Sequence, residues 1–231
     1  MSVRSAARRH RDEVGDVVAV HADRPGPLVA GGFVLAWLLL SGLTLINPAE
    51  TVLMTLAPTA AFALLVGLLL LYLGGERLLV CERGLVIGSV APGLRPYVIR
   101  YDQIVPGSMV PVTGARRYPA ETGTGGFPQS TVRRSAWTRQ GLHFVGPSPK
   151  AARRHRALLA PLQDPPPRSI DGRWVWFVGT GSSRPEQVTA EVARAAGAAG
   201  EAQLSQAAAT APVRELSGNR ADASRHLPGF R

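Results

Sequence analysis

Few residues in this chain of 231 have the types and spacing that could support chemistry. The most suggestive run is Gly-Thr-Gly-Ser-Ser-Arg at 179–184, which follows an apolar strand and precedes a helical pattern, as phosphate-binding loops do. It lacks the third glycine of a dinucleotide loop and the Gly-Lys-Ser/Thr ending of a P-loop, and no further strand follows to complete a parallel βαβ unit. A turn between a strand and a capped helix accounts for this run, so we expect no nucleotide there.

The histidines and the single cysteine give no catalytic or metal-binding pattern. The five histidines are scattered and lack ligand spacing or paired carboxylates: His10, His21, His143, His155 and His226. Cys81, the one cysteine, excludes an intrachain disulfide framework, and its apolar surroundings favour a small buried core residue over a reactive thiol. No serine nucleophile elbow and no HExxH motif is present. We therefore predict no enzyme activity, no catalytic residue, no metal and no cofactor.

Basic side chains are the remaining candidates for binding. The net charge is +10, carried by 25 Arg and one Lys, and residues 74–231 hold 21 basic against 11 acidic residues. One interpretation is a solvated, arginine-rich surface; the other is contact with anionic lipid headgroups or an acidic protein. The candidate contacts are Lys150, Arg153, Arg154, Arg156, Arg133 and Arg134. Nucleic acid is disfavoured, because no aromatic residues interleave with these clusters.

Two apolar segments precede the basic part of the chain. Residues 28–46 and 51–73 contain no charged residue, and 19 residues of helix extend over about 28 Å, close to the thickness of the hydrocarbon layer. The connection between them holds one acid, Glu50, and no basic residue. We therefore predict a transmembrane helical hairpin over 27–73. A cleavable signal peptide is disfavoured, because a charged leader of about 26 residues precedes the first segment and a second apolar segment follows it.

The flanking charges predict an orientation. Arg11 and Arg24 precede the first segment, and Arg77 and Arg83 follow the second, so the positive-inside rule places both termini in the cytoplasm of a multi-pass inner-membrane protein. Small residues at four-residue spacing allow close helix packing, either within the hairpin or in a homo-oligomer: Gly32, Ala36, Ala63 and Gly67. Neither segment has an ionisable residue, which disfavours a transport mechanism.

The rest of the chain has the pattern of a mainly-β domain. Short strands are expected at 77–81, 85–90, 97–101, 109–112, 131–138, 142–145 and 173–178, with flexible insertions near 113–130 and 147–170. Ser183 and Glu186 fit a capping box, and apolar residues at 188, 192, 195 and 199 predict one helix after the last strand. The predicted organisation is a charged cytoplasmic leader at 1–26, the hairpin, a domain at 74–198 and a disordered tail at 199–231.

This order resembles the bacterial pleckstrin-homology-like (PH-like) membrane proteins, in which paired transmembrane helices precede a small β-barrel capped by a C-terminal helix. The resemblance is carried by residues 76–87, by Tyr-Asp-Gln-Ile at 101–104 and by 176–188, and it covers about residues 30–198. It implies an α+β fold class: a membrane helical hairpin joined to a PH-like β-barrel or roll of about seven strands. It also implies a binding or scaffold module rather than an enzyme.

The expected function is therefore a membrane-anchored interaction or scaffold module whose partners are the lipid bilayer and either anionic headgroups or an acidic protein. The alternative is an accessory subunit of a larger membrane complex for transport or envelope assembly, which would contact its partners through the hairpin. A third, weaker alternative is an enzyme acting on lipid-linked substrates, which would need a polar pocket.

Overall fold

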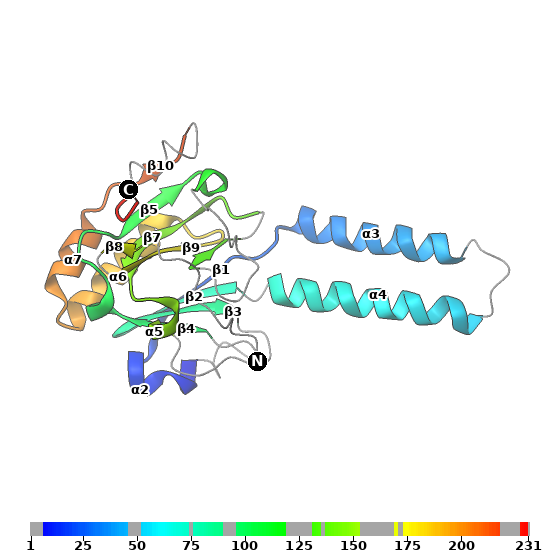
Figure 1. Cartoon of the computed structure of the whole chain (residues 1–231), viewed down its shortest axis with the longest axis horizontal. Helices are drawn as coiled ribbons and strands as arrows, with labels where there is room; N and C mark the ends of the chain where they lie inside the picture. Colours follow the sequence, from blue (N-terminus) through cyan, green and yellow to red (C-terminus); the bar gives the residue numbers. More distant parts are fainter. Residues whose placement is uncertain are drawn as a thin grey trace.

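The computed structural model describes residues 7–45, 52–73, 76–89, 96–118, 131–134, 137–152, 169–170, 173–217 and 227–230. Figure 1 shows a body of two sheets and several helices, from which a pair of long helices projects on one side. Helices α6 and α7 lie at the end of the body opposite that pair.

The first sheet contains four antiparallel strands in the order β1-β2-β3-β4. They are β1 (Val17–Ala22), β2 (Glu76–Cys81), β3 (Gly84–Ser89) and β4 (Tyr97–Arg100). A tight turn at residues 82–83 joins β2 to β3, so that Cys81 pairs with Gly84. Strand β1 pairs with β2 although the two long helices separate them in the chain, with His21 opposite Leu78. A short helix, α2 (Arg11–Val14), precedes β1.

The second sheet runs β10-β5-β7-β9-β6, and β8 also pairs with β9. Its strands are β5 (Val110–Thr113), β6 (Val132–Arg133), β7 (Gln140–Gly146), β8 (Ser169–Ile170), β9 (Arg173–Gly179) and β10 (Arg214–Glu215). The central pairs are antiparallel, whereas β6 lies parallel to β9 and β10 parallel to β5. Short helical turns connect the body: η1 (Tyr101–Gln103), η2 (Ala115–Arg117) and α5 (Pro149–Ala152).

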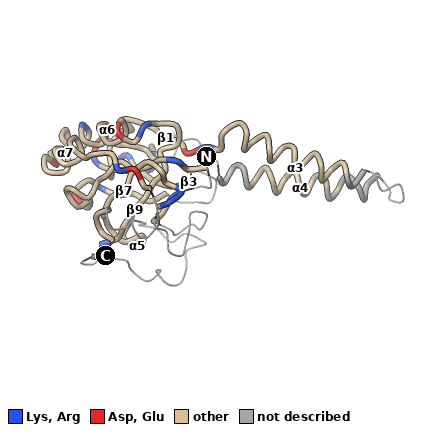
Figure 2. Tube along the Cα trace, turned by 90° about the horizontal axis from the view of Figure 1, so that it is seen from above, with Lys and Arg blue, Asp and Glu red and all other residues tan. Residues whose placement is uncertain are grey.

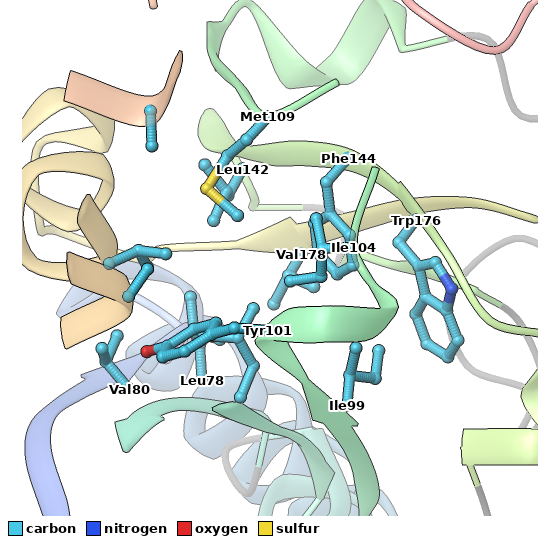
Figure 3. Packing of buried hydrophobic residues seen from close by; sticks show 14 of the residues in the cluster. Leu78, Val80, Ile99, Tyr101, Ile104, Met109, Leu142, Phe144, Trp176 and Val178 are labelled. Atoms are coloured by element: carbon cyan, nitrogen blue, oxygen red, sulfur yellow. The ribbon is translucent and has the colours of Figure 1, made fainter. Parts of the chain in front are cut away.

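The main core combines side chains of both sheets with the C-terminal helices (Figure 3). Trp176 of β9 is fully buried, with its ring edge-on to Tyr97 and parallel to Phe144. Helix α6 (Pro185–Ala198) and α7 (Ala202–Ala209) add Val188, Val192 and other apolar residues to the same cluster. Burial of this apolar surface is the main stabilising term of the fold.

The two long helices are α3 (Pro27–Leu45) and α4 (Val52–Leu73). Their bounds agree within one residue with the apolar segments identified from the sequence. Within the residues that the structure describes, however, no helix is long and apolar enough to cross a membrane. This finding contradicts the predicted transmembrane hairpin and the predicted multi-pass inner-membrane location with cytoplasmic termini.

The fold class also needs correction. A hairpin joined to one rolled domain of about seven strands was expected, but the described strands form an α+β fold with two separate sheets. The pairings that build the second sheet include parallel contacts between β5 and β10 and between β6 and β9, which join segments far apart in the chain. Periodicity within each segment carries no information about such contacts.

Both ends of the chain contain more structure than expected. The predicted charged leader includes α2 and β1, and β1 is an integral strand of the first sheet. The predicted disordered tail includes α7, β10 and a short segment at 227–230. Buried apolar residues explain the order in the tail: Leu204 packs in the main core, while Leu216 and Leu227 join a second cluster with Phe177.

Candidate functional site

The pair of α3 and α4, here called the apolar arm, carries most of the exposed large apolar side chains among the described residues. Figure 2 shows no charged residue on its described part, whereas basic and acidic residues are distributed over the body. Its exposed large residues are Leu28, Val34, Leu35, Leu38, Leu39, Leu40, Leu64, Leu65 and Leu68. At 100° per residue, five of the six in α3 lie within an arc of about 140°, and Leu40 points to the opposite side of the helix. No position of α3 carries a charged residue. A helix that is apolar all round requires an apolar environment on every side.

The small residues predicted to allow close helix packing, within the hairpin or in a homo-oligomer, include Gly32 and Gly67. A Cβ atom built at Gly32 or Gly67 would meet nothing within 4 Å. Ala36 of α3 is exposed, and Ala63 lies on α4 among other exposed residues. The surface of the arm is therefore open at these two glycines, and the packing role of the four small residues stays a prediction.

Where the arm joins the body, charged residues are brought together from three segments. Asp23 and Arg24 follow β1, and the backbone N–H of Asp23 donates to the carbonyl of Glu76 at the start of β2 (3.2 Å). The guanidinium of Arg133, from β6, forms an ion pair with the Glu76 carboxylate in which both side chains are largely buried. The Thr138 hydroxyl donates to the buried carboxylate of Asp23. Backbone and side-chain bonds together fix the base of the arm.

The predicted basic contacts are distributed differently from expectation. Arg133 is 5% exposed and bound to Glu76, so its guanidinium faces into the body. Arg134 donates to the carbonyls of Ala115 (2.8 Å) and Arg116 (3.1 Å). The side chain of Lys150 and all of Arg153, Arg154 and Arg156 lie outside the described residues, so their role as headgroup or partner contacts stays a prediction.

A buried polar network that sequence patterns did not indicate ties β1 to α6. His21 is 4% exposed; its Nδ1 lies 2.8 Å from the Ser183 hydroxyl and its Nε2 lies 2.7 Å from the Glu191 carboxylate. Because the carboxylate only accepts, Nε2 donates to it, and Nδ1 accepts from Ser183 when the ring is neutral. Ser183 therefore does not cap α6 as predicted, and Arg184 is the N-cap residue.

The 179–184 loop is held against β1. Gly181 has φ +63°, and a Cβ there would lie 2.0 Å from the carbonyl oxygen of Ala22, so only glycine fits. The Gln140 amide donates to the carbonyls of Gly181 (3.2 Å) and Ser183 (2.9 Å). These contacts account for the glycine and serine residues structurally, in agreement with the expectation that the run is a turn. The Ser-His-Glu contact is accordingly assigned to packing of β1 on α6.

A second buried histidine fixes the end of the chain. His143 of β7 is fully buried; its Nε2 donates to the carbonyl of Pro228 (2.8 Å), and its Nδ1 accepts from the Tyr118 hydroxyl (2.8 Å). Phe230 stacks on the imidazole with ring centroids 5.9 Å apart. Burial lowers the pKa of His143 to about 4, against an opposing effect of the hydrogen bond to Pro228. The imidazole is therefore neutral at pH 7, as a structural histidine requires.

We expect this histidine to make the fold acid-sensitive. Its pKa in the fold lies below the ordinary value of 6.5, so the unfolded chain takes up the proton first and stability falls as the pH drops from about 6.5 to 4. The loss should approach about 3 kcal/mol. Urea unfolding at pH 7 and at pH 4.5 measures it, and His143→Gln, which cannot titrate, should show a smaller loss between the two pH values. Equal losses in both proteins would contradict this assignment.

Cys81 lies in a buried position of β2, as predicted. It is 1% exposed, and burial, with smaller effects of Glu82 and Asp16, raises the pKa of its thiol to about 12. The thiolate is therefore not populated at neutral pH, and a reactive role is disfavoured.

One open polar cleft lies at the edge of the first sheet. It has a volume of about 550 Å³ and is lined by α2, the β2–β3 turn, η1 and the α6–α7 turn. Arg100 and Asp102 form an exposed ion pair there, and Arg83 donates to the carbonyl of Asp12 (3.2 Å). Among the described residues, no group of three or more His, Cys, Asp or Glu side chains could hold a metal ion. The cleft therefore presents no metal centre and no nucleophile paired with a base.

The described strands do not form the PH-like barrel or roll that the resemblance implies. They belong to two separate sheets, and two of the strand pairs are parallel. Searches against protein-family models, curated proteins and solved structures find no match to this chain, so membership of the PH-like membrane family is not supported.

Proposed function

We propose that this protein is an interaction module that associates with lipid through the apolar arm and presents its two-sheet body beside the lipid surface. The observation that supports this proposal most directly is the exposure of large apolar side chains on both helices of the arm, including Leu39 (62%) of α3 and Leu65 (61%) of α4. Neither helix contains a charged residue, which suits burial of the arm among acyl chains.

The free energy gained by removing these side chains from water favours a strong association. Each large apolar side chain that leaves water contributes about 1.5–3 kcal/mol, and the described part of the arm exposes nine of them. Exposed apolar patches of this extent on a folded protein mark interaction sites. Burial among acyl chains would remove these side chains from water whether or not either helix crosses the bilayer.

The test is co-flotation of the full chain with vesicles. Protein kept in mild detergent is diluted into phosphatidylcholine vesicles, and the bound fraction is measured after flotation. We expect wild-type protein to float and the variant Leu39→Asn/Leu65→Asn to bind at least tenfold more weakly, because both side chains are more than 60% exposed and contribute to the surface rather than to the core.

A matched control uses two exposed valines of the body. Val18 of β1 and Val213 beside β10 are exposed but lie outside the arm, so Val18→Ser/Val213→Ser should leave flotation unchanged. Failure of the wild type to float would overturn the proposal. Formation of defined oligomers without lipid, abolished by the same leucine substitutions, would overturn it in favour of an arm that binds a second copy or another protein.

A further inference from the structure

Arg77, in the second position of β2, has an unusual environment. It lies opposite Ala22 on one side and Gly88 on the other. Its Nε–H is buried and has no hydrogen-bond partner among the described residues. A buried donor without an acceptor costs about 1–3 kcal/mol, and more when it belongs to a charged group. Such a group in a native fold calls for an acceptor, and none of the described residues supplies one for Arg77.

A second guanidinium, that of Arg24, lies near Arg77 and also favours an anion there. Arg24 follows Asp23, whose N–H bonds the carbonyl of Glu76, so Arg24 lies beside the start of β2. Burial and the positive charge of Arg24 both lower the pKa of Arg77, in that order of importance. Two like charges that approach each other at a partly buried position are relieved by an anion between them.

The nearby carboxylates are engaged elsewhere. Glu76 pairs with Arg133, and Asp23 accepts the hydroxyl hydrogen bond of Thr138. Each of these two carboxylates therefore already has a partner within the body. The side chain of Arg24 is exposed and that of Arg77 is half-buried.

We propose that Arg24 and Arg77 form a binding site for a phosphate oxyanion, and that the phosphate belongs to a lipid headgroup. Guanidinium groups bind phosphate oxygens with paired, charge-assisted hydrogen bonds. The position of the site identifies the source: Arg24 lies three residues before α3 begins and Arg77 lies four residues after α4 ends, so both cations flank the base of the apolar arm. A lipid, which carries a phosphate beside its acyl chains, matches both the arginine pair and the apolar arm. This inference rests on the proposed association of the arm with lipid.

The experiment compares full-chain flotation with phosphatidylcholine vesicles and with vesicles that also contain phosphatidylglycerol, whose headgroup has no compensating cation. We expect wild-type protein to prefer the anionic vesicles by roughly tenfold or more, and added salt to reduce that preference. Arg24→Gln/Arg77→Gln should lose the preference but still bind phosphatidylcholine. The control Arg194→Gln/Arg214→Gln removes the same charge from exposed positions on α6 and β10 and should retain it.

Each result has a defined meaning. An unchanged preference in Arg24→Gln/Arg77→Gln, or an equal loss in the control, would overturn the site and leave only general surface charge. If millimolar inorganic phosphate binds the wild type in detergent but anionic vesicles are not preferred, the site takes free phosphate and the lipid source is overturned. Absence of binding to both vesicle types would overturn the proposed function instead, so the two failures are distinguishable.

Discussion

Replacing Trp176 with alanine should lower the free energy of unfolding by about 4 kcal/mol. The indole is fully buried at the centre of β9, where its centroid lies 5.0 Å from that of Tyr97 and 6.2 Å from that of Phe144. Its Nε1–H donates to the carbonyl of Pro147 (2.8 Å). The substitution removes the contacts that join the two sheets in this part of the core, leaves a cavity and deprives that carbonyl of its donor (Figure 3).

Urea unfolding followed by circular dichroism measures this change. Trp174 provides the control, because it lies on the same strand, is only partly buried and packs against the edge of the same cluster. Trp174→Ala should cost clearly less than Trp176→Ala. Equal effects would mean that the central position of Trp176 between the sheets does not determine its contribution.

Arg133→Ala should also cost about 4 kcal/mol, for an electrostatic reason. Only 4% of the Arg133 side chain and 17% of the Glu76 side chain are exposed, so removing the guanidinium leaves a mostly buried carboxylate without its cation. That carboxylate must then ionise in a poorly solvated site or take up a proton. The lost stability is measured by chemical unfolding at pH 7.

A double-mutant cycle separates pairing from packing. Glu76→Gln alone leaves the guanidinium unpaired, while Glu76→Gln/Arg133→Ala removes both charges and should cost less than the sum of the single changes. Arg100→Ala is the matched control, since the Arg100–Asp102 pair is exposed at 47% and 40% and should leave the unfolding midpoint nearly unchanged. Additive single effects would contradict coupling across the buried pair.

Local patterns predicted the local elements well. The turn at 82–83 and the apolar runs on either side of it predicted β2 and β3, and the alternating aromatic run at 173–178 predicted β9, all within two residues of the observed bounds. Uncharged composition located α3 and α4 within one residue. These features depend on neighbours in the chain, which is why a single sequence reveals them.

Contacts between residues far apart in the chain could not be predicted from local patterns. β1 is six residues long and lies among charged residues, so composition alone predicts a polar leader there; only its pairing with β2 makes it a strand. Ser183 has the correct spacing for a helix cap, but His21, 162 positions away in the chain, binds its hydroxyl instead. The pairing of Arg133 with Glu76 likewise joins residues 57 positions apart, so an arginine expected at the surface is buried.

The insertion of the arm between β1 and β2 has a consequence for the order in which the protein folds during synthesis. β1 leaves the ribosome first, but its partner β2 follows only after both apolar helices have emerged, and Val17 must find Cys81 across 64 positions of chain. Closing so long a loop is entropically costly and slow. A nascent chain halted inside α4 would therefore expose leucines while holding an unpaired strand, a state prone to aggregation. Capture of the arm by its partner before β2 appears would shorten that interval and bring the two strands to the same place.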